Sequence, residues 1–209
     1  MPIIDCLDLR QILERWPHYS REALLERLRA RGAVLRPGQL LEVRPGSRSL
    51  SLSFAEKISS GLVLVFDYGA PTRALYGSAR ISGTLSSFQA HQVSRDVLSE
   101  PGSRDITAWV DFGEIEEAFI ASGLTVHGLV SQSRFLSAAG MTRELELVDA
   151  SPGTSAERLA EKNAIAKLFA PEGMGESIRV LVAGRGLRTG TAWVKWPKPP
   201  EPPEPHVGV

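Results

Sequence analysis

Polar side chains that could do chemistry follow an apolar run in the middle of the chain. Asp67, Tyr68 and Gly69 come directly after the run Gly61–Phe66. An unbroken apolar run is typical of a strand that is buried on both faces of a parallel sheet. Ligands of open α/β sheets bind beyond the carboxyl ends of such strands. We therefore expect these three residues at the edge of a site, where Asp67 could hold a ligand group or could simply cap the next turn.

A second group of candidates belongs to the long segment that follows. Residues 70–106 show no sustained helix or strand periodicity, and a loop of that length in a compact domain is either functional or disordered. His91 could act there as an acid or base near neutral pH, although a solvent-exposed histidine is the more common case. Asp105, Thr107 and Asp111 close the segment, and such short polar side chains either contact a ligand or serve as turn and cap residues.

Several classes of function are excluded by what the chain contains. The four histidines include no pair at metal-ligand spacing, and Cys6 is the single cysteine, so we expect no metal site. A Ser-His-Asp hydrolase is excluded because no Gly-x-Ser-x-Gly elbow follows a strand.

The overall charge argues against two kinds of partner. The formal net charge is zero, from 24 basic and 24 acidic residues, so we expect no general electrostatic grip on nucleic acid or on an anionic membrane. No apolar run approaches the roughly 20 residues of a membrane helix, and the start of the chain lacks a signal-peptide pattern. A single cysteine suits a reducing compartment. The sequence therefore predicts a cytoplasmic protein.

The elements that must position these residues alternate between helix and strand. Ser20 predicts the cap of a helix that ends at Gly32, and residues 51–60 predict another helix. Asp111 with Glu114, and Thr154 with Glu157, have capping-box spacing, and Ser131 introduces a short helix. The predicted strands are Gln39–Val43, Leu62–Phe66, Leu124–Val130 and Ile178–Ala183, with a possible fifth at Thr191–Trp196. This alternation favours an α/β fold with only three convincing core strands.

These residues also carry a resemblance to a known family. Over residues 36–183, their order and spacing resemble the MidA-type family of class I S-adenosylmethionine-dependent methyltransferases, whose mitochondrial members act as arginine methyltransferases in respiratory complex I assembly. Trp109 departs from the family pattern, which has a polar residue there, often histidine. The matching residues are Glu42-Val43, Asp67-Tyr68-Gly69, Gly83-Thr84-Leu85, His91, Pro101-Gly102, Asp105-Ile106-Thr107, Val110-Asp111-Phe112, Gly123, Ser131-Gln132, Phe135-Leu136, Gly140 and Met174-Gly175-Glu176.

The resemblance implies a Rossmann-like sheet of seven strands, of which this chain supplies the fifth, sixth and seventh. S-adenosylmethionine is the implied cofactor, but the glycine-rich loop and the acidic strand end that hold it in the first half of the fold are absent from this sequence. The implied organisation is a helical segment at residues 1–35, the C-terminal half of a methyltransferase domain at 36–196, and a Pro-rich disordered tail at 197–209.

The resemblance also implies roles for the candidate residues. For an arginine acceptor, carboxylates would orient the guanidinium group, ideally as bidentate pairs. The implied catalytic residues are Asp67, Tyr68 and His91, and the implied substrate-binding residues are Gly69, Asp105, Thr107 and Asp111.

Two hypotheses of different kinds follow. In the first, the chain is a methyltransferase half that works with a separately encoded N-terminal half and acts on a protein substrate. It predicts an open sheet edge and an exposed apolar face, and a truncated gene would predict the same. In the second, the chain is a catalytically inactive remnant that acts as a protein-interaction module.

Overall fold

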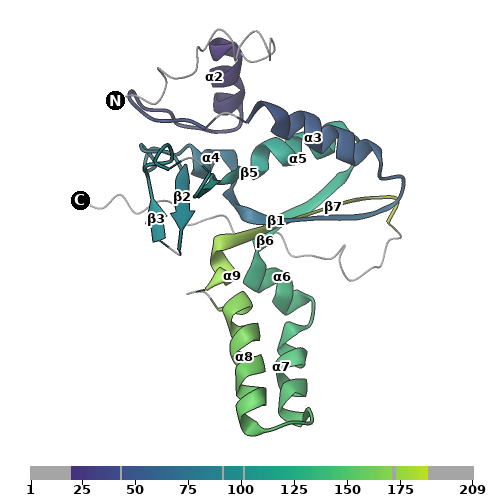
Figure 1. Ribbon diagram of the computed structural model, residues 1–209. Coiled ribbons are helices and arrows are strands. Elements are labelled where there is room, and N and C mark those ends of the chain that lie inside the picture. Colours follow the sequence, from purple (N-terminus) through teal and green to yellow (C-terminus); the bar gives the residue numbers. More distant parts are fainter. Residues whose placement is uncertain (1–19, 43, 91, 101, 171–172, 188–209) are drawn as a thin grey trace, which may run out of the picture. The chain divides into compact units, whose positions relative to one another are not determined.

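The computed structural model describes residues 20–42, 44–90, 92–100, 102–170 and 173–187 (Figure 1). These residues form two compact units. The described residues within Met1–Phe54 and Gly69–Ala118 belong to the first unit, and those within Ala55–Tyr68 and Phe119–Val209 belong to the second. Each unit is described by itself below. The predicted segments Thr191–Trp196 and 197–209 lie outside the described residues, and the domain organisation predicted from the sequence stays a prediction.

The first unit begins with the predicted N-terminal helix. Helix α2 (Arg21–Ala30) starts at Ser20, whose hydroxyl oxygen accepts a hydrogen bond from the Ala23 amide at 3.1 Å. It ends at Gly32, which has a φ of 82°. The buried residues Leu28, Ala33, Ala70, Leu75 and Tyr76 form one core of this unit. The sequence prediction of this helix is confirmed.

Two predictions for the following segment are wrong. Residues Gln39–Glu42 do not form a strand, and Val43 lies outside the described residues. The Leu40 amide donates to the Ile81 carbonyl, and the Gln39 side chain donates to the carbonyls of Gly77 and Arg80. These single contacts do not form the repeated backbone hydrogen bonds of a strand pair. Helix α3 (Pro45–Glu56) starts before the predicted range 51–60 and ends earlier. Proline is favoured in the first turn of a helix, so Pro45 begins the helix where we expected a turn.

The segment 70–106 is ordered into small elements, so the expectation of a long loop is wrong. A short helix is followed by a three-stranded antiparallel sheet in the order β3-β2-β4. In its register Phe88 lies opposite Val93 on one side and opposite Asp105 on the other. The elements are α4 (Thr72–Leu75), β2 (Ser86–Gln89), β3 (Gln92–Ser94) and β4 (Asp105–Thr107).

The first unit closes with a strand and a helix that join at Asp111. Strand β5 (Val110–Asp111) pairs in parallel with Gly69 and Ala70, the last two residues of strand β1 (Gly61–Ala70). Helix α5 (Phe112–Ala121) follows directly. Its apolar side chains Ile115, Ala118 and Phe119 are buried, as their helical spacing predicts.

The second unit contains three strands. Residues Gly61–Tyr68 of β1 pair antiparallel with β7 (Ile178–Arg185), and β7 pairs antiparallel with β6 (Thr125–Ser131). The seventh strand of the resemblance therefore lies between the fifth and the sixth and runs against both. Val180, Leu181, Val182 and Ala183 are buried, so β7 is the central strand of this unit.

The prediction that β1 is buried on both faces is wrong. Val63 is buried, but Leu64, Phe66 and Tyr68 alternate along the strand and are 41%, 44% and 44% exposed. Alternate side chains of a strand point to the same face, and this face of β1 is covered only in part, where Phe66 packs on Phe135. An apolar run in the sequence therefore does not reveal which faces of a strand are covered by other elements.

Helices complete the second unit. Ser131 caps α6 and Thr154 caps α8 with a complete capping box, as the sequence predicts. Helix α7 was not predicted. Figure 1 shows α7 and α8 side by side, and contacts join them. The helices are α6 (Gln132–Ala138), α7 (Met141–Ala150), α8 (Ser155–Phe169) and α9 (Met174–Ser177).

Candidate functional site

Asp111 lies at the junction of β5 and α5 and is 4% exposed. One carboxylate oxygen, Oδ1, accepts hydrogen bonds from the Thr72 hydroxyl at 2.6 Å and from the amides of Gly113 at 3.0 Å and Glu114 at 3.4 Å. The first amides of a helix have no partner within the helix, and an aspartate at the cap position satisfies them. Asp111 is thus the N-cap of α5, as one of the two interpretations of this residue predicted.

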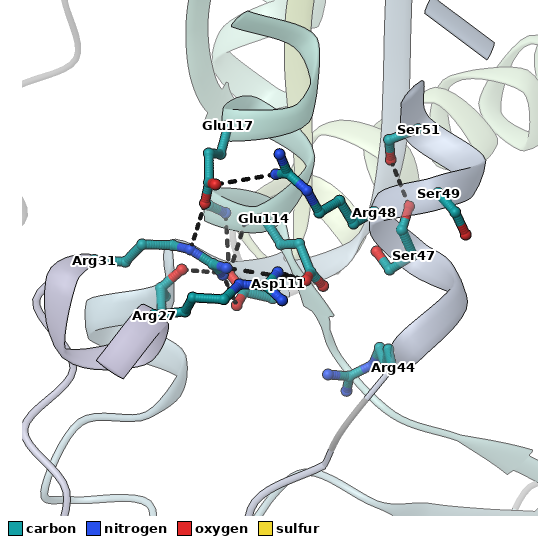
Figure 2. Close-up of polar contacts among 12 residues, drawn as sticks. Arg27, Arg31, Arg44, Ser47, Arg48, Ser49, Ser51, Asp111, Glu114 and Glu117 are labelled. Atoms are coloured by element: carbon teal, nitrogen blue, oxygen red, sulfur yellow. Dashed lines mark hydrogen bonds and ion pairs between the residues drawn. The ribbon is translucent and has the colours of Figure 1, made fainter. Parts of the chain in front are cut away.

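The other oxygen of Asp111 meets an arginine that comes from α2. Arg31 Nη1 donates to Asp111 Oδ2 at 3.3 Å, and Arg31 Nε donates to Glu117 at 2.8 Å. Arg27 donates to Glu114 at 2.9 Å, and Arg48 of α3 donates to Glu117 at 3.0 Å. Figure 2 shows Arg31 between Asp111 and Glu117. Three arginines thus hold α2 and α3 against the start of α5.

Burial sets the electrostatics of this cluster. Burial raises the pKa of the Glu114 carboxyl above its ordinary value, and the guanidinium groups of Arg31 and Arg27 oppose the rise. Burial, assisted by the Asp111 carboxylate, raises the pKa of Tyr76 to about 12, while Arg44 acts in the opposite direction. Tyr76 is therefore a neutral phenol at physiological pH, and its hydroxyl donates to the Glu42 carbonyl at 3.1 Å.

The cavity beside this cluster is too small for a substrate. Its volume is about 20 Å³, and Arg31, Arg44, Tyr76, Asp111 and Glu114 are among its lining residues. A space of that size holds about one water molecule. The carboxylates of the cluster are already engaged by arginines and amides. The arrangement therefore fixes the orientation of α5 and leaves Asp111 little capacity to hold a further cation.

Gly69 is explained by close packing. It pairs with Val110, and a Cβ added at Gly69 would lie against the Val110 carbonyl and 2.7 Å from Cε2 of Phe112. A side chain at this position would push β1 and β5 apart. The absence of a side chain is thus required by the strand pairing, whatever else Gly69 does.

Asp67 and Tyr68 belong to the second unit and are exposed. The Asp67 carboxylate accepts a hydrogen bond from the Tyr68 amide at 2.7 Å, and the Tyr68 side chain is on the partly covered face of β1. Among the described residues, no cation lies within ion-pair distance of Asp67. Both side chains are available to a ligand, and their catalytic role stays a prediction.

Asp105 and Thr107 lie together on one face of the small sheet of the first unit. They alternate along β4, and their register partners on β2 are Phe88 and Ser86. Asp105, Thr107 and Phe88 are all exposed. A groove of about 320 Å³ lies beside Asp105 and Phe88. The structure thus brings two of the predicted substrate-binding residues to one surface. The third candidate of this segment, His91, lies outside the described residues.

Sequence reasoning missed the residues that support these positions. The Glu42 carboxylate accepts hydrogen bonds from the amides of Thr84 and Leu85, the latter at 2.8 Å, and so anchors the start of the small sheet. Gly83 has a φ of 66°, and an added Cβ would meet Glu42. The resemblance contained Glu42 and Gly83 as separate motifs, but a single sequence cannot reveal that they touch. Trp109 packs against the core of the first unit, and Arg80 lies 4.1 Å from its ring centre.

In the described part of the chain, no group of three or more His, Cys, Asp or Glu side chains is arranged to hold a metal ion. Within the same residues, no helix combines the length and apolar character needed to cross a membrane.

Comparison with known proteins identifies the family. A family model described as "Putative S-adenosyl-L-methionine-dependent methyltransferase" matches residues 7–130, more than half of the chain. The chain belongs to this methyltransferase family. The resemblance to MidA-type methyltransferases is thereby confirmed, and so is the Rossmann-like α/β fold class, which the solved structures below support.

Two curated relatives carry a stated activity. The chain is 31% identical to "Protein arginine methyltransferase NDUFAF7, mitochondrial" of Xenopus laevis over 114 residues. This match covers 54% of this chain and 24% of that protein. The protein of the same name from Xenopus tropicalis gives the same values. The chain thus matches about a quarter of the length of these relatives.

Two solved structures from Burkholderia thailandensis share the fold. The first is an uncharacterized protein, with a TM-score of 0.73 and 29% identity, over 85% of this chain and 46% of that one. The second was solved bound to S-adenosyl-homocysteine, with a TM-score of 0.72 and 29% identity, over 85% of this chain and 44% of that one. The chain therefore spans less than half the length of either structure.

Proposed function

We propose that this chain forms the acceptor-side half of an S-adenosylmethionine-dependent methyltransferase that modifies arginine side chains of proteins. The methyl donor would be held mainly by elements outside these 209 residues, whether they belong to a longer form of the chain or to a separate polypeptide. The observation that carries the proposal is the match to the structure bound to S-adenosyl-homocysteine, which covers 85% of this chain but 44% of the other.

The described residues do not fit the methyl donor. Donor binding in Rossmann-like folds uses a glycine-rich turn whose open amides lead into a helix, with an acidic strand end for the ribose. In the described part of the chain, the helices α5 and α6 follow strands directly, but Asp111 and Ser131 already cap them. Helix α4 has only four residues. These junctions therefore offer the methyl donor no helix longer than four residues with an uncapped start.

The open side of β1 supports a partner half. Gly61–Tyr68 pair with β7 along one edge, and no described strand pairs with these residues along the other. Leu64, Phe66 and Tyr68 are also exposed on one face. Unpaired strand edges and exposed apolar patches promote aggregation, and folded proteins usually cover them. A further set of strands and helices beside β1 would satisfy both.

The arginine acceptor is suggested by the two curated relatives and by the available carboxylates. Methyl transfer of this class depends largely on positioning, because donor and acceptor must lie in line. Carboxylates hold a guanidinium in a defined plane through paired hydrogen bonds. Asp67 and Asp105 are exposed and able to do this, whereas Asp111 is committed to its cap.

A methyl-transfer assay tests the proposal. The purified chain would be combined with the polypeptide that supplies a glycine-rich strand–turn–helix, sought first in the neighbouring reading frame. Label from the methyl group of S-adenosylmethionine is expected on arginine-containing protein only when both parts are present. No transfer by a complex that binds the donor would overturn the proposal and favour the alternative, a non-enzymatic interaction module.

A further inference from the structure

One face of the small sheet β3-β2-β4 carries an exposed carboxylate beside an exposed aromatic ring. Asp105 on β4 and Phe88 on β2 are directly paired across the strands, so their side chains share one face. Phe88 is 38% exposed. Among the described residues, no Lys, Arg or His side chain forms an ion pair with Asp105. Asp105 is therefore not held in an ion pair with a described residue.

A groove beside this pair has both apolar and polar residues in its lining. It measures about 320 Å³ and is lined by Phe88, Gln89, Ala90, Ser103 and Asp105. That volume is at the lower end of the range for small-ligand sites, about 300–1,000 Å³. No lining residue carries a positive charge.

Neighbouring bonds determine which atoms remain available in the groove. The Gln89 side-chain nitrogen donates to Glu100 at 3.1 Å and to Ser103 at 3.4 Å, which leaves its amide oxygen as an acceptor. The carboxylate of Glu100 is partly neutralised by Arg104 at 3.6 Å. Among the lining residues, Asp105 is the one that carries a charge.

We propose that this groove, defined by Phe88, Gln89, Ser103 and Asp105, binds an arginine side chain of an extended polypeptide. A guanidinium is planar, carries five N–H donors, stacks on aromatic rings and forms paired hydrogen bonds with a carboxylate. A lysine ammonium is a strongly hydrated point charge that cannot stack in the same way. The groove's single carboxylate, aromatic ring and neutral acceptors therefore fit a guanidinium better than an ammonium.

This inference deepens the proposed function and rests on it only for the role of the bound arginine in methyl transfer. Binding itself requires no methyl donor. The two proposals can therefore fail separately. Arginine binding without methyl transfer would overturn the proposed function alone, whereas transfer that is unaffected by changes in the groove would overturn the docking site alone.

The test is the affinity of the purified chain for three matched peptides that carry one arginine, one lysine or one citrulline between glycines. Calorimetry would measure affinity, and amide chemical shifts would locate the site. We expect the arginine peptide to bind most tightly and to shift amides of β2 and β4. Asp105→Asn should weaken its binding about tenfold, or about 1.4 kcal/mol, because the neutral amide cannot form the charge-assisted hydrogen bonds of a carboxylate. Phe88→Leu should weaken it about threefold, because leucine has no aromatic ring on which the guanidinium can stack.

Two control variants separate recognition from damage to the fold. Ile106→Ala changes an exposed residue on the opposite face of the same strand, and Glu146→Gln removes a charge from exposed α7. Both should bind the arginine peptide like the parent chain, and circular dichroism should show all four variants folded. Equal affinity for the three peptides, or unchanged affinity of a folded Asp105→Asn variant, would overturn the proposal.

Discussion

Replacing Asp111 by alanine should destabilise the first unit more than any change to the exposed charges around it. The carboxylate accepts four hydrogen bonds, from Thr72, Gly113, Glu114 and Arg31, and is 4% exposed. Asp111→Ala removes the N-cap of α5 and leaves the buried Thr72 hydroxyl without its acceptor.

The expected cost can be estimated from these contacts. Loss of an N-cap costs about 0.5–2 kcal/mol, and breaking a buried ion pair from one side costs about 3–5 kcal/mol. Arg31 keeps its bond to Glu117 at 2.8 Å, so the lower end applies, about 3 kcal/mol in total. For a chain of this size that loss lowers the melting temperature by roughly 10 °C.

Glu117→Gln is the matched control, because Glu117 also pairs with Arg31 but its side chain is 45% exposed. Exposed ion pairs contribute about 0–1 kcal/mol. Thermal unfolding followed by far-UV circular dichroism would compare the variants, and hydrogen exchange would locate the change. The amides of Gly113 and Glu114 should lose protection in Asp111→Ala, while those of α8 keep theirs. If Asp111→Ala cost no more than Glu117→Gln, the capping argument would be refuted.

Three further changes have defined outcomes. Burial raises the pKa of Tyr76 to about 12 from 10.0, so between these pH values the folded chain retains a proton that the unfolded chain loses. The free energy of unfolding should therefore fall as pH rises from 10 to about 12. Tyr76→Phe should abolish this part of the pH dependence of chemical unfolding, and an unchanged profile would contradict the prediction. Gly83→Ala should lower the free energy of unfolding by about 1–3 kcal/mol, because of the positive φ and the clash with Glu42. Gly102 also has a positive φ, but a Cβ there would meet nothing within 4 Å, so Gly102→Ala should cost less in the same denaturation assay. Equal losses of stability would exclude the clash. Thr154→Ala should remove the capping box of α8 and destabilise this helix by about 1 kcal/mol. Hydrogen exchange in the first turn of α8 should become faster, and unaltered exchange there would contradict the prediction.

The helix starts could be predicted from the sequence because capping is local. Ser20, Asp111, Ser131 and Thr154 each act on amides two or three residues away, so sequence spacing contains the whole interaction. The same holds for the apolar face of α5. The start of helix α3 could not be predicted in this way, because proline is equally suited to a turn and to the first turn of a helix.

The small sheet and the surroundings of β1 could not be predicted, because contacts distant in the sequence determine them. Strands β2, β3 and β4 are short and lack an alternating apolar pattern, and Glu42 anchors their start from about 40 residues away. The apolar run of β1 is also the same whether one face or both faces receive a partner. Asp105 and Thr107 were recognised as candidates, but their pairing with Phe88 and Ser86 required the strand register.

The central claim is that this chain supplies the acceptor side of a methyltransferase while other elements hold the donor. Titration calorimetry with S-adenosylmethionine tests it most directly, on the purified chain alone and after addition of the polypeptide that supplies the glycine-rich strand–turn–helix. We expect no donor binding by the chain alone and clear binding by the combination. Donor binding by the chain alone would contradict it.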